Sequence, residues 1–188
     1  MRILTGALLA TSLVFGAQTV QANNFSGAFL AGRYADGNKD YAAAAQYYTR
    51  ALAFQPGNPE LMEALALAQL MQGEFDVAVP VAKLMEDNGV KSQVAQMLVT
   101  ADLGRNGEFD AIIERSSEAG QGIGPLVDGL VRAWALVGKG QVEEGMSAFD
   151  DLSRQQGLRG FALFHKALAL AQIGEFASAE AIFGQDEA

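Results

Sequence analysis

The chain has 188 residues, half of them apolar, with 13 basic and 22 acidic side chains and a formal net charge of −9. An acidic surface without a basic cluster repels phosphate groups, which excludes nucleic acid and anionic lipid as expected partners. The absence of cysteine excludes disulfides, thiolate metal sites and a cysteine nucleophile.

The N-terminus is typical of an export signal. A short positive segment ends at Arg2, residues 3–16 are apolar, and residues 20–22 (Val-Gln-Ala) offer the small or aliphatic side chains that a signal peptidase reads. The apolar run is shorter than the roughly 20 residues needed to span a bilayer. We therefore expect a signal peptide at residues 1–22, cleavage after Ala22 and a periplasmic mature protein. The alternative is an uncleaved signal anchor.

A large side chain recurs at a nearly fixed interval along the rest of the chain. Steps of 34, 34, 33 and 34 residues from Tyr41 reach Phe75, Phe109, Val142 and Phe176. A period of this length is typical of stacked helical hairpins. We therefore expect about five helix-turn-helix repeats, at approximately 25–58, 59–92, 93–125, 126–159 and 160–188.

The first repeat is expected to pair helices at 25–36 and 41–54, with Phe29, Leu30 and Gly32 on or near the packed side of the first helix.

The second repeat is expected to pair helices at 59–72 and 75–87. Asn58 can cap the first of these, and Pro59 suits its first position because the missing N–H would have been unpaired there. Pro80 removes a backbone hydrogen bond inside the second helix, so we expect a bend or a loosened turn.

The third repeat is the least regular. Gly104 weakens its first helix (93–105), and two serines at 116 and 117 weaken its second (109–119). The glycine-rich stretch 120–125 is expected to be a loop or hinge, since it follows no strand and lacks the spacing of a phosphate-binding loop. The helices of the remaining repeats are expected at 126–137, 142–155, 161–173 and 176–183.

These residues resemble the tetratricopeptide repeat. Its second half is matched by the order Tyr41, Ala44, Tyr48, Ala51 and Pro56. Its small first-half position falls on Gly32, Ala66, Thr100, Ala133 and Ala167, and its turn glycine on Gly73, Gly107, Gly140 and Gly174. The first-half tryptophan position departs from the family and holds Ala28, Met62, Gln96, Gly129 and Leu163. The resemblance covers residues 25–183 and implies an all-α fold, a right-handed α-solenoid.

Two segments, 32–52 and 124–141, together with the leader, are similar to the start of a longer exported repeat protein of Gram-negative bacteria. Residues 1–188 would then be an N-terminal portion. The chain's end, which supplies no polar capping helix, favours the same expectation.

The sequence offers no catalytic, cofactor or metal site. His165, the only histidine, lies on an apolar helix and is interpreted as a residue between repeats, since a general base would need a nucleophile and an orienting acid. Residues 36–40 open like a calcium loop, but Tyr41 stands where glycine is required. The acidic pairs at 143–144 and 150–151 are interpreted as solvated charge.

The resemblance also implies a concave face lined by the first helix of each repeat. Its positions map to Phe29, Arg33, Glu63, Leu67, Leu70, Met97, Ala101, Arg105, Leu130, Trp134, Val137, Phe164 and Leu168. Most are apolar, and the lysines and asparagines that clasp a peptide carboxylate in chaperone-binding members are absent.

We therefore expect a non-catalytic scaffold, without a cofactor, that holds a protein or peptide segment in an apolar groove, in cell-envelope assembly or export. Trp134 is the expected anchor. The alternatives are that Leu130 and Trp134 are core residues, that the chain is a homo-oligomerisation module, or that it is the regulatory N-terminal part of a larger envelope enzyme.

Overall fold

The computed structural model describes residues 25–116 and 122–184, and this part of the chain is all-helical. The helices follow one another as five hairpins: α1 (Phe25–Gly37) with α2 (Tyr41–Leu52), α3 (Pro59–Met71) with α4 (Phe75–Asp87), α5 (Gln93–Arg105) with α6 (Phe109–Arg115), α7 (Pro125–Gly138) with α8 (Val142–Ser153), and α9 (Arg159–Gln172) with α10 (Phe176–Gly184). The predicted solenoid of helical hairpins is confirmed. The predicted leader lies outside the described residues.

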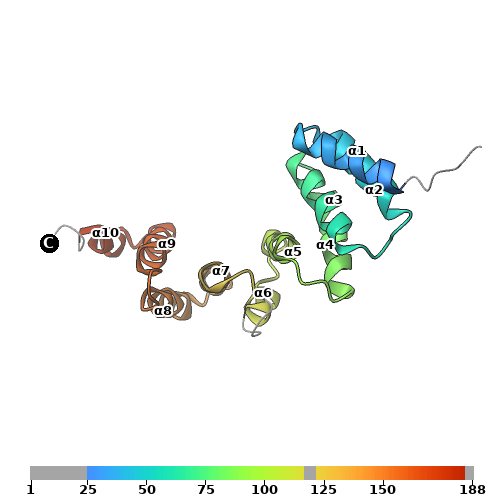
Figure 1. The fold of residues 1–188 in the computed structure, drawn as a ribbon. Helices are drawn as coiled ribbons and strands as arrows, with labels where there is room; N and C mark the ends of the chain where they lie inside the picture. The colour runs from blue at the N-terminus through green and yellow to red at the C-terminus, as the bar shows by residue number, and fades with distance from the viewer. Residues whose placement is uncertain (1–24, 117–121, 185–188) are drawn as a thin grey trace, which may run out of the picture.

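The hairpins form an extended, curved row with α1 at one end and α10 at the other (Figure 1). Each helix packs on its neighbours in the chain, and among the first helices α3 also touches α5 and α7 touches α9. The two ends of the row are therefore separate surfaces.

The turn inside each hairpin places one residue in the left-handed region of φ. The glycines there are Gly73, Gly107, Gly140 and Gly174, with φ of 81°, 73°, 87° and 88°. In the first hairpin the same position holds Lys39, with φ of 61°. Glycine adopts this conformation without steric cost, which is why it recurs at the repeat period.

Side-chain caps begin several helices. The predicted cap at Asn58 is confirmed, because its Oδ1 accepts a hydrogen bond from the Leu61 backbone N–H at 3.2 Å. Asp40 and Ser92 cap α2 and α5 in the same way. Pro80 does not interrupt α4, which continues through it to Asp87.

The core consists of large side chains packed against small ones. Tyr48 in the first hairpin and Phe149 in the fourth are fully buried. A Cβ added at Gly32 would lie 2.7 Å from the Tyr48 ring, so only glycine permits this approach. Burial raises the pKa of the Tyr48 phenol, and the nearby Asp36 carboxylate acts in the same direction.

One interpretation of an individual residue was wrong, because Leu30 is 65% exposed, on a side of α1 that no described helix covers. The Asp150 side chain is 44% exposed, and its Oδ1 also accepts a hydrogen bond from Lys166 Nζ at 2.6 Å, which joins α8 to α9. Sequence spacing could not reveal this pair, whose members lie on different helices.

Candidate functional site

A large apolar hollow, of about 800 Å³, lies where the third hairpin meets the fourth and fifth. Four helices line it. The lining residues are Thr100, Ala101 and Gly104 of α5, Phe109 and Ile112 of α6, Val127, Leu130, Val131, Trp134, Ala135, Val137 and Gly138 of α7, His165 and Gln172 of α9, and Ile173 at the C-cap of α9. Ligand-binding clefts in proteins commonly have about this volume.

The third hairpin, which contributes two helices to the hollow, is less regular than predicted. The predicted second helix at 109–119 ends early, since α6 has only 7 residues and stops at Arg115. The remaining predicted residues, 117–119, lie outside the described part of the chain. Phe109, at the start of α6, packs on α7 so closely that a Cβ added at Gly138 would lie 2.7 Å from its ring.

Trp134 is the largest side chain in the hollow, and it is only partly buried. Its ring meets the Phe149 ring edge-on, with centroids 5.8 Å apart. Its indole Nε1–H donates a hydrogen bond to His165 Nδ1 at 3.1 Å. Trp134 therefore contributes both to the packing of the fourth hairpin and to the wall of the hollow.

His165 lies between the fourth and fifth hairpins, as predicted. It is the one titratable side chain among the residues that line the hollow. Because Nδ1 accepts the Trp134 hydrogen bond, the neutral ring carries its proton on Nε2. A hollow with this lining offers apolar contact and very little acid–base chemistry.

The structure divides the predicted groove residues into two groups. Those that line the hollow together are Ala101, Leu130, Trp134 and Val137. The others lie outside it along the row of first helices: Phe29, Arg33, Glu63, Leu67, Leu70, Met97, Arg105, Phe164 and Leu168.

Several residues outside the hollow are exposed apolar side chains. Met97 is 55% exposed and Phe164 is 50% exposed. Sequence reasoning missed the contributions of α6 and of Val127 and Ile173 to the hollow. Their position depends on the distance between α5 and α7, which the residue pattern does not predict.

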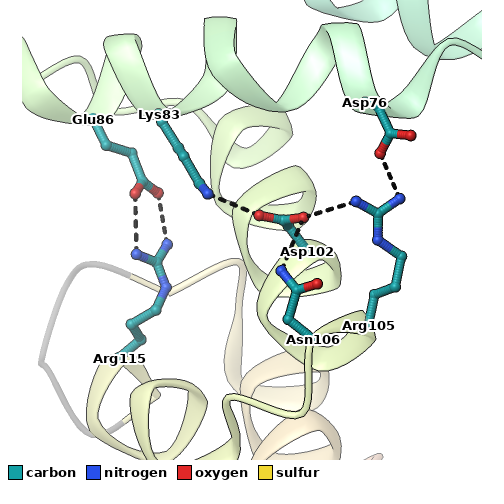
Figure 2. A network of polar contacts seen from close by, with 7 residues as sticks. All are labelled: Asp76, Lys83, Glu86, Asp102, Arg105, Asn106 and Arg115. Carbon is teal, nitrogen blue, oxygen red and sulfur yellow. Dashed lines mark hydrogen bonds and ion pairs between the residues drawn. The ribbon is translucent and has the colours of Figure 1, made fainter.

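A polar cluster joins the second and third hairpins beside the hollow (Figure 2). The Asp102 side chain is 7% exposed and accepts hydrogen bonds from Lys83 at 2.8 Å and from Arg105 at 3.1 Å. Arg105 continues to Asp76 at 2.5 Å. The position of Asp102 holds alanine in neighbouring repeats, at Ala68 and Ala135, and this substitution in the repeat pattern was a sequence clue to the cluster.

A second ion pair lies close by. Arg115 donates two hydrogen bonds to Glu86, at 3.0 and 2.6 Å, and both side chains are partly buried (Figure 2). Two parallel bonds of this kind fix the relative orientation of the helices that carry them. The end of α6 is thus attached to α4.

Replacing Asp102 by asparagine should lower the Tm at neutral pH by several degrees. The hydrogen bond from Lys83 lowers the pKa of Asp102, the charges of Lys83 and Arg105 reinforce the effect, and burial opposes it. A depressed folded-state pKa stabilises the fold above the unfolded-state value of about 3.9, and this contribution is lost as the pH falls through the folded-state pKa.

The difference in Tm between the wild type and Asp102→Asn should therefore be constant near neutrality and shrink below about pH 4. Thermal unfolding followed by circular dichroism at a series of pH values would measure it. A difference that persisted unchanged in acid would show that the charge of Asp102 contributes nothing.

No helix within residues 25–116 and 122–184 is long and apolar enough to cross a membrane. The chain has no significant match among curated proteins or among solved structures.

Two family models described as tetratricopeptide repeat match the sequence, over residues 37–101 and 130–187. The unmatched interval contains most of the third hairpin, which is also where α6 is short and the hollow opens. Together with the five stacked hairpins and their recurring turn residue, these matches establish that the chain belongs to the tetratricopeptide repeat family, whose members generally mediate protein–protein interaction.

Proposed function

We propose that the protein is a non-catalytic interaction scaffold of the cell envelope, and that its hollow binds the apolar face of a helical segment from a partner protein. The observation that carries this proposal is the lining itself: an apolar surface from four helices with Trp134 in its wall. Amphipathic helices bind such grooves through side chains at i, i+3, i+4 and i+7.

Partial burial suits Trp134 to the role of an anchor. A tryptophan that already packs on Phe149 loses little side-chain freedom on binding, and residues of this kind contribute strongly to interfaces. The same packing means that Trp134→Ala would disturb the fold as well as the surface. A sharper variant changes a residue at the edge of the hollow, and Val127, which is 37% exposed, offers one.

The single tryptophan gives a direct readout of occupancy, since the protein's tryptophan emission comes only from Trp134. The probe is a synthetic tryptophan-free peptide helix whose leucines at i, i+3, i+4 and i+7 form one apolar stripe, called here the striped peptide. It is compared with a scrambled peptide of the same composition. We expect the striped peptide to shift the emission and to bind with an affinity that depends weakly on salt, because the contact is apolar.

Val127→Glu should weaken binding of the striped peptide by about tenfold or more. Leu84→Glu is the matched control, because Leu84 is an exposed apolar residue, 50% accessible, that lies on α4 outside the hollow. Equal binding of the striped and scrambled peptides, or an equal loss of affinity in both variants, would show that the hollow is not the binding site.

The envelope location rests on the leader at residues 1–22. Protein recovered from the periplasm should have an intact mass that corresponds to a chain starting at Asn23. Recovery of the unprocessed chain from the cytoplasm would contradict the location without affecting the peptide-binding test.

A further inference from the structure

Four side chains in the lining of the hollow carry a group that can form a hydrogen bond: Thr100 on α5, Trp134 on α7, and His165 and Gln172 on α9. The Trp134 N–H already donates to His165 Nδ1 at 3.1 Å. A ligand can therefore form hydrogen bonds with the other three, which differ in how firmly the protein holds them.

The His165 ring is held in one orientation. Besides the hydrogen bond at Nδ1, the ring meets the Trp134 ring edge-on, with centroids 6.2 Å apart. The Phe164 ring meets it at a similar angle, with centroids 5.7 Å apart. The imidazole cannot rotate without losing these contacts and the hydrogen bond.

The hydrogen bond from Trp134 determines which atom His165 offers to a ligand. Because Nδ1 is the acceptor, the neutral ring carries its proton on Nε2. His165 has no second hydrogen-bond partner within residues 25–116 and 122–184, and Nε2 is not a buried unpaired atom. Nε2–H is therefore a donor that water can reach in the free protein.

The other two polar side chains can adapt to an apolar ligand. The Thr100 hydroxyl can rotate to a backbone carbonyl one turn earlier in its own helix. Gln172 is exposed at the C-terminal end of α9 and can keep its contact with water. His165 is partly buried and fixed, so it has neither option.

A helix that fills the hollow takes water away from His165 Nε2–H. A donor that loses water without gaining an acceptor costs affinity, and a site with such a donor discriminates against ligands that lack the matching acceptor.

Charge indicates which kind of acceptor fits. Among the described residues that line the hollow, none is lysine or arginine, and the chain carries a net charge of −9. A carboxylate on the ligand would lose its water without gaining a counter-charge and would be repelled by the acidic protein. A neutral oxygen, such as that of a glutamine side chain, accepts the hydrogen bond without this cost.

We propose that His165 determines the specificity of the hollow by donating Nε2–H to one neutral acceptor in the apolar stripe of the bound helix. Glutamine is the natural candidate, because it favours a helix about as well as leucine does. This inference rests on the proposed function, since it concerns the partner of the same hollow. Trp134 is then also a positioning residue, because its N–H keeps the His165 proton on Nε2.

The position of the proton can be measured directly. His165 is the only histidine in the chain, so in untagged protein with ¹⁵N-labelled histidine both ring nitrogen signals belong to it. Long-range proton–nitrogen NMR spectra of the neutral ring should place the proton on Nε2. A proton on Nδ1 would overturn the proposal, because Nδ1 could not then accept from Trp134.

Substituted versions of the striped peptide test the recognition itself. Each of the four stripe leucines is replaced in turn by glutamine, and in a matched set by methionine, which has a similar length but is only a weak acceptor. A third set carries glutamate. Calorimetric titration against the full chain gives the affinity of each peptide, and the glutamine peptide that meets His165 should bind more tightly than its glutamate counterpart.

His165→Asn separates the donor from the rest of the site. The asparagine oxygen can still accept from Trp134, but the shorter side chain has no group at the position of Nε2. For one stripe position, the affinity ratio of the glutamine peptide to the methionine peptide should be about tenfold higher in the wild type than in His165→Asn. Leu168→Asn, on α9 but outside the hollow, is the matched control and should keep the wild-type ratio.

Circular dichroism checks that the variants fold, and His165→Phe, which also lacks the donor, is the second variant if His165→Asn does not. Equal ratios in the wild type and the donor-free variant at all four positions, with the striped peptide still bound, would overturn this inference alone. If no striped or substituted peptide binds more tightly than the scrambled one, the proposed function fails and this inference fails with it.

Discussion

Replacing Phe149 by alanine should lower the free energy of unfolding by about 3 to 5 kcal/mol. Phe149 is fully buried in a core with Ala133 and Ala169, so it links the first helices of the fourth and fifth hairpins through the helix between them. The small residues around it cannot expand to fill the space left by the ring. Truncation should therefore leave a cavity and not a collapsed core.

Urea unfolding followed by circular dichroism would measure this loss. Phe54→Ala makes the same chemical change at a residue that is 49% exposed, and it should change the free energy of unfolding by less than about 0.5 kcal/mol. Trp134 emission should also change in Phe149→Ala, because the two rings are in contact. Equal stability of the two variants would show that the fourth hairpin does not depend on this core.

Replacing Gly145 by leucine should destabilise the protein by about 3 kcal/mol, at the upper end of the usual cost of overpacking. A Cβ at Gly145 would lie 2.6 Å from a Val137 methyl group and 3.1 Å from the Ala133 backbone oxygen. The methyl group can move, but the backbone oxygen moves only if α7 and α8 separate. Because leucine favours a helix interior more than glycine does, by roughly 0.8 kcal/mol, the measured loss understates the steric cost.

Gly57→Ala is the matched glycine control for this variant. A Cβ there meets nothing within 4 Å, so the change in the free energy of unfolding should stay within about 0.5 kcal/mol. A Gly145→Leu protein as stable as the wild type would mean that the two helices tolerate a wider separation than their packing indicates.

The fold was largely predictable from the sequence, because its determinants are local and repeat along the chain. The recurring large residue at Tyr41 and its equivalents marks the start of each second helix, and a glycine such as Gly73 marks the turn in four of the five hairpins. Both features act within one hairpin. The prediction failed at Leu30, because burial there depends on a contact beyond the hairpin, and no described helix covers that side of α1.

The candidate site was predictable only in part. The repeat pattern assigns Leu130 and Trp134 to a first helix, and the structure places both in the hollow. The end of α6 was not predictable, because a seven-residue helix could not be distinguished by pattern from the predicted eleven residues. The Asp102 cluster depends on Lys83, which is distant in sequence and lies on another hairpin.

The short α6 also affects how the molecule unfolds. The stability of a repeat array is approximately a sum over repeats and the contacts between neighbours, so it behaves like a one-dimensional chain of coupled units. The two helices of the third hairpin pack on each other less extensively than those of any other hairpin in the described row, which makes this hairpin the weakest coupling there. The hairpins before and after it should then unfold as two cooperative blocks, which hydrogen exchange would resolve as two levels of protection. The third hairpin would then bend more easily than the blocks on either side of it. Widening of the hollow would therefore cost less free energy than any other change in how the hairpins pack.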